Sequence, residues 1–424
     1  MSNATASMTY QDLFAVLAGR LPEAGGSVDL QPATGSPVEV RAYPFTSENC
    51  DVHPEADYQQ TDPTLRALIA YYLKQSPYSE EHLFGGLSSG DREIRENYRF
   101  AYYVLFPKGG FDEGESRFSR GTLLLHGLNE KEWSKYLPWA LRLVELTGRP
   151  VLLFPIAFHM NRTPPAWSNP RAMIEVARER KRLFTELSTS TFANAALSHR
   201  LQFAPHRFLT SGLQSYYDLR DLLARIVSGD QELFAPEATV DLFGYSAGAT
   251  LSQTLLMTEG ESILSRSRLF IFCGGSILEH SNPISKAIMD AEAHRELFRF
   301  LRELSLNPHP FIPWGIGRSL QGSEEFELLR SLILSSNLRE LREERMGRVA
   351  DRIKLVALGK DQVFYPAGVT ASWQRRNGTS LLDVEVHDPD YEYSHEQPFP
   401  HREGNPEIDR SFREIMEKAA GHLG

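Results

Sequence analysis

From residue 98 onward, short apolar runs alternate with helical patterns, and this alternation restricts the fold more than any other feature of the sequence. Runs typical of strands occupy residues 98–106, 121–127, 150–158, 238–248, 268–275, 352–359 and 381–386. Helical patterns follow several of them, as at 133–148 and 408–420. Strands that alternate with helices form mostly parallel sheets covered on both faces. The sequence therefore predicts an α/β fold with a doubly wound, mostly parallel sheet.

The first 95 residues do not follow this alternation. Apolar residues at helical spacing predict short helices over 9–20 and 61–76, separated by stretches rich in Pro and Gly. We interpret residues 1–95 as an N-terminal extension that packs on a larger body.

Two later segments, 159–210 and 276–350, are too long to be ordinary connections between a strand and a helix. The second contains helical patterns at 283–306 and 322–346. We interpret both segments as insertions that form a cap on an α/β domain spanning 96–424.

Composition excludes several classes of protein. With 45 basic and 55 acidic residues the net charge is -10, which disfavours binding to the phosphates of nucleic acids. Two cysteines, Cys50 and Cys273, supply neither a disulfide framework nor a zinc site, so no metal is expected. No cofactor is expected either, because neither GxGxxG nor a Walker A string follows any strand. No apolar run approaches the roughly 20 residues of a membrane span, and no cationic leader is evident. We expect a cytoplasmic protein.

The most informative motif is GYSAG at 244–248, which matches the pattern GxSxG. A strand precedes it and a helix rich in small residues follows, which is the context of a nucleophile elbow. In such a turn a serine is exposed between the strand and the helix, here Ser246.

A nucleophilic serine needs an acid and a base, which follow it in the order acid and then His in this type of fold. Asp361 comes directly after the strand predicted at 352–359 and is the preferred acid. Glu279, after the preceding strand, is an alternative.

The base is expected in the loop after the strand at 381–386. His387 stands directly at the end of this strand, His395 lies eight residues further on, and His401 is more remote. Because a catalytic imidazole must reach back over the sheet, we favour His395 and keep His387 as the alternative.

An oxyanion hole requires two backbone N–H groups that point at the developing negative charge. One is expected from Ala247, the residue after the nucleophile. The other is expected from the loop after the strand 121–127, where Leu128 is the candidate. We expect His126 to brace this loop by hydrogen bonds rather than to transfer protons.

Four strings in this order, LLLHG, GYSAG, GKD and SHEQP, resemble the α/β-hydrolase superfamily over residues 98–424. The resemblance implies the same five residues in the same roles: Ser246, Asp361 and His395 as the triad, with Leu128 and Ala247 as oxyanion donors. The HGGG form of the oxyanion loop is absent, because Leu-Asn-Glu follows the HG. This departure disfavours the hormone-sensitive-lipase-like branch.

Residues 156–171 follow a strand at its carboxyl end, where ligands bind in open α/β sheets. His159, Arg162 and Trp167 are therefore candidates for substrate binding, beside the plainer interpretation of a structural loop braced by prolines.

These features predict a serine hydrolase, carboxylesterase- or lipase-like, that cleaves a small-molecule ester or thioester through an acyl-enzyme. A peptidase or an acyltransferase would use the same triad. A non-catalytic binding protein of the same fold is the alternative from another class. Nucleotide binding is disfavoured, because neither GxGxxG nor a Walker A string follows any strand.

Overall fold

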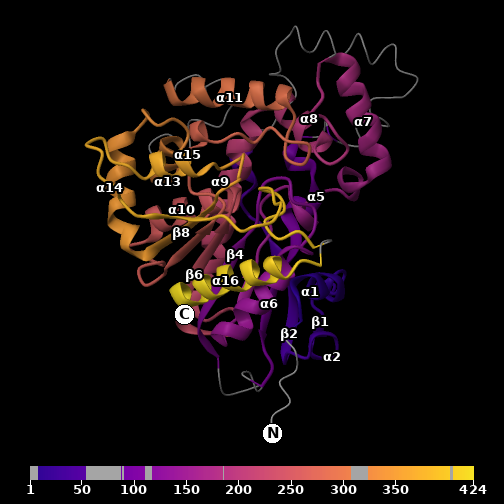
Figure 1. Ribbon diagram of the computed structural model, residues 1–424, viewed down its shortest axis with the longest axis vertical. Coiled ribbons are helices and arrows are strands. Elements are labelled where there is room, and N and C mark those ends of the chain that lie inside the picture. Colours follow the sequence, from indigo (N-terminus) through magenta and orange to yellow (C-terminus); the bar gives the residue numbers. More distant parts are fainter. Residues whose placement is uncertain are drawn as a thin grey trace.

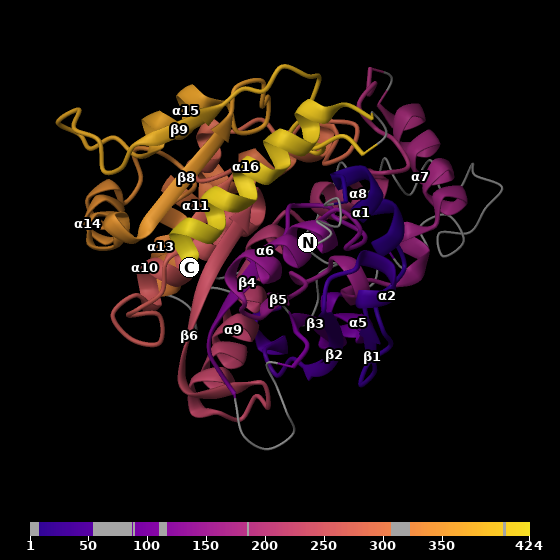
Figure 2. The ribbon, with the colours of Figure 1, turned by 60° about the horizontal axis from the view of Figure 1, so that its bottom comes forward.

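The computed structural model describes residues 8–53, 87, 90–109, 117–184, 186–306, 323–401 and 404–424. A nine-stranded sheet runs through the molecule in the order β1-β2-β3-β5-β4-β6-β7-β8-β9 (Figures 1 and 2). Its strands are β1 (Ser27–Asp29), β2 (Val38–Thr46), β3 (Arg99–Pro107), β4 (Phe118–Leu125), β5 (Val151–Leu153), β6 (Phe234–Tyr245), β7 (Leu269–Phe272), β8 (Ile353–Leu358) and β9 (Val384–His387).

The strands from β5 to β9 in this order are all parallel, whereas β1, β2 and β3 pair in antiparallel fashion and β3 pairs antiparallel with β5. The predicted α/β class with a mostly parallel sheet is therefore confirmed. Every strand predicted from residue 98 onward is present.

Helices cover both faces of the sheet. They are α1 (Tyr10–Leu17), α2 (Gln31–Thr34), α5 (Arg95–Tyr98), α6 (Tyr136–Thr147), α7 (Pro170–Leu183), α8 (Ala195–Phe203), α9 (His206–Ser228), α10 (Ala247–Glu259), α11 (Ala291–Leu306), α13 (Glu324–Ser331), α14 (Arg339–Val349), α15 (Pro366–Ser372) and α16 (Pro406–Leu423). Helices α1, α6 and α16 pack on one face, and α9, α10, α13 and α14 lie on the other (Figure 2).

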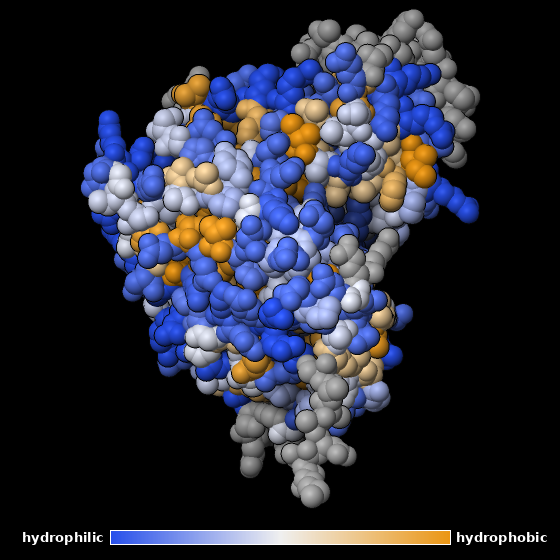
Figure 3. Space-filling view, in the orientation of Figure 1, coloured by the Kyte–Doolittle hydropathy of each residue, from blue (hydrophilic) through white to orange (hydrophobic). Residues whose placement is uncertain are grey.

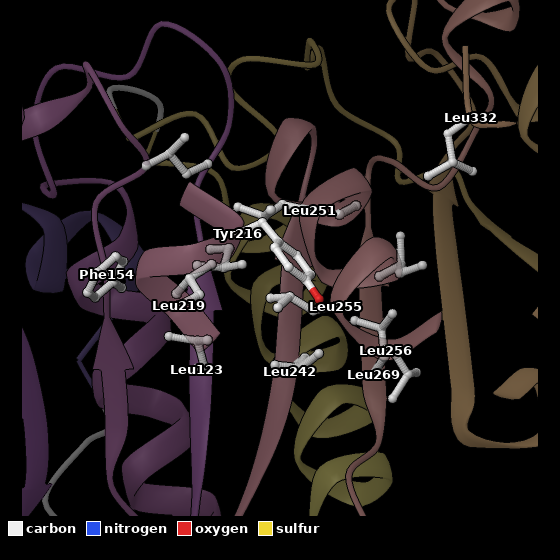
Figure 4. Close-up of a cluster of buried hydrophobic side chains, with 14 of the residues drawn as sticks. Leu123, Phe154, Tyr216, Leu219, Leu242, Leu251, Leu255, Leu256, Leu269 and Leu332 are labelled. Atoms are coloured by element: carbon white, nitrogen blue, oxygen red, sulfur yellow. The ribbon is translucent and has the colours of Figure 1, made fainter. Parts of the chain in front are cut away.

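Alternation along the central strands explains why both faces are buried. In β6, Leu242 belongs to the apolar cluster under α9 and α10, and its neighbour Phe243 to the cluster under α6 and α16. Successive side chains of a strand point to opposite faces, so a strand between two helical layers must be apolar throughout. Figure 4 shows Leu242 with Leu219 of α9 and Leu255 of α10.

The N-terminal part of the chain contributes two strands to the sheet, more than the expected extension. Helix α1 confirms the helical pattern over 9–20, and the helix predicted at 61–76 lies outside the described residues. Strands β1 and β2 extend the sheet beside β3, which the sequence analysis did not predict. The division into an extension (1–95) and a domain (96–424) stays a prediction.

Three elements differ from their predicted extents. Strand β5 has only three residues of the nine expected, since Pro155 follows closely and the chain turns at Phe158, whose φ is 60°. Helix α11 starts at Ala291 instead of residue 283. The pattern at 322–346 forms two helices, α13 and α14, because the chain turns sharply at Leu338, whose φ is 48°.

Both predicted insertions contain helices, and a buried ion pair joins them. Arg180 of α7 donates two hydrogen bonds of 2.7 Å to the carboxylate of Asp290, which precedes α11. Both side chains are almost fully buried, at 2% and 0% exposure. Asp290 also accepts a hydrogen bond from the Ala293 N–H in the first turn of α11. This pair therefore fixes the start of α11 against α7.

We expect Asp290→Asn to lower the free energy of unfolding by about 3 to 5 kcal/mol, because it leaves the Arg180 guanidinium buried without a counter-charge. The measurement is urea denaturation of both proteins. Glu303→Gln is the matched control, since Glu303 is 60% exposed in its pair with Arg299 and its loss costs about 0.5 kcal/mol or less. Equal denaturation midpoints for Asp290→Asn and wild type would contradict the assignment.

Hydrophilic residues prevail on the face shown in Figure 3, with hydrophobic residues in small separate groups between them. Among the helices in the described parts of the chain, none combines the length and apolar character that crossing a membrane requires.

Candidate active site

Ser246 lies in the tight turn between β6 and α10. Its backbone has φ 55° and ψ -121°, a conformation that L residues rarely adopt and that concentrates at functional sites. The flanking glycines allow this turn. A Cβ on Gly244 would lie 2.6 Å from Ala249 Cα, and one on Gly248 would lie 2.3 Å from the Leu125 carbonyl oxygen.

Three side chains from distant parts of the sequence form one hydrogen-bonded chain. The Ser246 hydroxyl lies 2.8 Å from His395 Nε2, and His395 Nδ1 lies 2.8 Å from Asp361 Oδ2. All three residues are buried, with exposures of 3%. A carboxylate only accepts hydrogen bonds, so His395 must donate through Nδ1–H and present its Nε2 lone pair to the serine hydroxyl.

Asp361 follows the carboxyl end of β8 and is oriented by the backbone. Its Oδ1 accepts hydrogen bonds of 2.8 Å from the N–H groups of Val363 and Phe364. This leaves Oδ2 for His395. The carboxylate is thus held in one orientation by the turn in which it lies.

The loop that carries His395 is attached to the elbow and to α6. The Tyr245 hydroxyl donates to the His395 carbonyl oxygen, and the two rings are stacked with centroids 5.6 Å apart. Lys135 donates through Nζ to the Glu396 carbonyl oxygen at 3.2 Å and forms an ion pair with Glu130. Tyr245, the residue before Ser246, therefore also positions His395.

The alternative acid and bases lie elsewhere. Glu279 accepts hydrogen bonds from the backbone N–H and hydroxyl of Ser335. His387, at the end of β9, is hydrogen-bonded to the Ser411 hydroxyl at 2.7 Å. The His401 ring is stacked on Phe14. In none of these contacts does the side chain meet Ser246.

The loop after β4 brings the backbone of Leu128 to the same site. The neighbouring N–H groups have partners: Gly127 donates to the Tyr136 hydroxyl at 3.0 Å, and Asn129 donates to His159 Nε2 at 2.9 Å. Within the described chain, the Leu128 N–H between them has no acceptor. Ala247 is the first residue of α10, and the first N–H groups of a helix have no partner within it. Leu128, Ala247 and Ser246 line one cavity.

Two buried histidines brace this loop. His126 Nε2 accepts a hydrogen bond of 2.9 Å from the Ile156 N–H, and His126 Nδ1 contacts the Gly127 carbonyl oxygen. In the same way, His159 Nε2 accepts a hydrogen bond from the Asn129 N–H, and His159 Nδ1 donates one of 2.9 Å to the Ala157 carbonyl oxygen. Burial lowers the pKa of His159 to about 4 and that of His126 well below its usual value. Both rings are therefore neutral at pH 7.

The cavity beside Ser246 has a volume of about 120 Å³ and a mostly apolar wall. The lining comes from α9, α10, α11, α13 and the loops before and after them; its larger apolar members include Phe208, Leu209, Leu251, Ile288, Met289, Leu297, Phe298, Leu301, Leu329, Leu332 and Phe364. Their role as a cavity wall could not be predicted from the sequence, because an apolar residue of a helix has the same pattern in a core and in a cavity wall.

The three candidates of the 156–171 loop are placed differently. His159 lines the cavity. Arg162 does not: it is fully buried, its Nη2 lies 2.7 Å from Asp218 Oδ2, and its other nitrogens donate to carbonyls and to Asn97. Trp167 lies under the Arg200 guanidinium, whose carbon is 4.4 Å from the ring centroid, and borders a separate, smaller cavity. The structure thus corrects the expectation that Arg162 and Trp167 face the pocket of Ser246.

In the described ranges, no group of three or more His, Cys, Asp or Glu side chains is arranged to hold a metal ion.

The solved structures that resemble this protein cover most of its chain. An esterase of Pyrobaculum calidifontis is similar in structure, with 12% identity, coverage of 86% of this chain and 98% of that chain, and a TM-score of 0.41. Carboxyl esterase 2 of Tuber melanosporum has 12% identity, coverage of 86% and 100%, and a TM-score of 0.39. Acetyl xylan esterase 1 of a Thermoanaerobacterium species has 17% identity, coverage of 75% and 79%, and a TM-score of 0.32.

No curated protein matches the sequence. One family model matches residues 8–424, nearly the whole chain. The protein therefore belongs to the family described as a family of unknown function, DUF6051.

Proposed function

We propose that the protein is a serine hydrolase that cleaves small carboxylic esters or thioesters through an acyl-enzyme on Ser246. The observation that supports this best is the buried chain Ser246–His395–Asp361, with two distances of 2.8 Å, at the wall of an apolar cavity. A serine hydroxyl is a weak nucleophile unless a base oriented by a third group takes its proton. These three side chains have the geometry for that task.

In the proposed reaction, Ser246 Oγ attacks the carbonyl carbon while its proton passes to His395 Nε2. The N–H groups of Leu128 and Ala247 stabilise the oxyanion, and Asp361 stabilises the imidazolium. The bond to the leaving group then breaks, and the leaving oxygen or sulfur takes the proton from His395. Water attacks the acyl-enzyme in the same way, with His395 again as base, and releases the carboxylic acid and free Ser246.

The elbow conformation also favours catalysis over a purely binding role. Holding a non-glycine residue such as Ser246 in a rare backbone conformation costs about 1 to 3 kcal/mol. Such strained conformations concentrate at functional sites, and here the turn holds Oγ 2.8 Å from His395 Nε2, as a nucleophile requires.

The test is a trapping experiment with p-nitrophenyl butyrate. Acid quenching during turnover should give a peptide with Ser246 heavier by one butyryl group. Release of nitrophenol without any adduct on a serine would contradict the acyl-enzyme. An adduct on another serine would show that this other residue, and not Ser246, is the nucleophile.

His159 provides a second prediction, because its Nε2 holds the Asn129 N–H beside the Leu128 N–H. We expect His159→Leu to lower kcat by about 100-fold with little change in KM, since a misplaced oxyanion donor acts mainly on the transition state. His159→Gln offers a carbonyl acceptor and should recover most of the loss. Equal losses for Leu and Gln, or a change confined to KM, would contradict this positioning role.

A further inference from the structure

We infer that the cavity beside Ser246 binds the acyl part of the substrate and selects an uncharged aliphatic chain of medium length. The inference rests on the proposed hydrolase function and adds the class of substrate. It follows from the position of the cavity relative to the triad, from the chemistry of its wall and from its size.

The position of the cavity assigns it to the acyl side. Ser246 and both oxyanion candidates, Leu128 and Ala247, line the cavity, but His395 is absent from its described lining. His395 must deliver a proton to the leaving group, so the leaving group has to lie next to its ring. The cavity therefore extends from the other side of the carbonyl carbon, where the acyl chain is attached.

The chemistry of the wall excludes charge. No Asp, Glu, Lys or Arg is among its described lining residues, and its one imidazole, His159, is neutral at pH 7 because burial lowers its pKa to about 4. A charged acyl group would lose its hydration without gaining a partner, which is strongly unfavourable. An alkyl chain loses only contact with water, which is favourable.

The wall is built largely by the predicted cap. Leu297, Phe298 and Leu301 come from α11, and Leu332 follows α13. Leu251 of α10 also lines the cavity, and Figure 4 shows Leu251 and Leu332 at the upper end of the buried apolar cluster. The helices of the 276–350 insertion therefore set the length and width of the chain that fits.

The volume limits the chain length. About 120 Å³ holds about eight to twelve groups of the size of a water molecule, at about 10 to 15 Å³ for each. If a methylene group is counted as about the size of a water molecule, acyl chains of about eight to twelve carbons fill the cavity. Shorter chains leave part of the wall without contacts, and longer ones exceed the space.

The experiment measures kcat/KM of the full chain for p-nitrophenyl esters from acetate to palmitate. We expect kcat/KM to rise about three- to fourfold for each added methylene, reach its maximum near octanoate to dodecanoate, and fall for longer chains. The p-nitrophenyl monoester of glutaric acid, whose free carboxylate is charged, should react at least about 100 times more slowly than the pentanoate.

Two variants of α11 distinguish the effect of a change in the cavity wall from the effect of a change elsewhere on the same helix. Phe298→Ala enlarges the cavity at a half-buried position and should shift the maximum by at least two carbons toward longer chains. Arg299→Ala, next in sequence, changes a half-exposed residue that pairs with Glu296 and Glu303, and should leave the profile unchanged. Labelling of Ser246 by a fluorophosphonate reports an intact site in both variants.

The outcomes distinguish a failure of the chain-length inference from a failure of the hydrolase proposal on which it rests. A labelled Ser246 with a flat profile, a maximum at acetate or an unshifted maximum in Phe298→Ala overturns the chain-length inference and leaves the hydrolase proposal standing. Absence of both labelling and ester turnover in the folded wild type overturns both.

Discussion

Replacement of Ser246 by alanine should reduce ester hydrolysis by at least about 10⁴-fold in kcat, to the background of the assay. Within the proposed mechanism no other group can form the acyl-enzyme, since His395 Nε2 and the oxyanion candidates all converge on the Ser246 hydroxyl. The measurement is the steady-state rate with p-nitrophenyl butyrate at pH 7.5, at protein concentrations high enough to detect the residual rate.

The fold should survive this substitution, because alanine differs from serine only in lacking the hydroxyl group and therefore occupies less space. Thermal unfolding should therefore give a melting temperature within a few degrees of the wild type. Ser228→Ala, at the exposed end of α9, is the control for the chemical change and should keep full activity. Turnover by Ser246→Ala at more than a few per cent of the wild-type rate would place the nucleophile elsewhere.

Replacement of Asp361 by asparagine should lower kcat by about 10⁴-fold. The reason lies in the two N–H groups of Val363 and Phe364, which donate to Oδ1. An Asn side chain keeps these bonds only with its carbonyl oxygen at that position, so its NH₂ group faces His395. His395 then has to accept through Nδ1 and carry its proton on Nε2, where it cannot take the serine proton.

Asp390→Asn is the matched control, since Asp390 is exposed and the same chemical change there should leave kcat unaltered. The ratio of kcat for the two variants isolates the effect at position 361 from that of losing one negative charge elsewhere on the protein. A loss of less than tenfold in Asp361→Asn would mean that the carboxylate does not orient the base.

The central strands were predictable because most of their residues are buried on both faces and form apolar runs, as in Leu123–Leu125 of β4. Strand β2 was missed although its buried residues alternate with less buried ones, as in Val38 and Val40, because Pro44 and its Pro- and Gly-rich surroundings favour a loop. The short β5 ends where the backbone turns, which apolar composition does not reveal.

The Ser246–His395–Asp361 constellation could be predicted because each residue follows a recognisable strand and chain order restricts the choice. Reach across the sheet favoured His395 over His387, and the structure has His395, not His387, next to Ser246. The roles of the three residues stay predictions until they are tested.

Other features of the site depend on three-dimensional contacts that no local pattern encodes. Arg162 is a candidate ligand in the sequence, yet Asp218 of α9, 56 positions away, binds it in the interior. The bond from the Tyr245 hydroxyl to the His395 carbonyl likewise joins residues far apart in sequence. The cavity wall consists of ordinary apolar helix residues, so only their convergence distinguishes it from the core.

The most direct test of the central claim, that Ser246 is an activated nucleophile, is labelling with a fluorophosphonate followed by peptide mass spectrometry. The probe requires no knowledge of the substrate. We predict one adduct, on Ser246, formed by the wild type and lost in His395→Ala. No adduct on the folded protein at millimolar probe, or an adduct that forms equally fast in His395→Ala, would contradict the account.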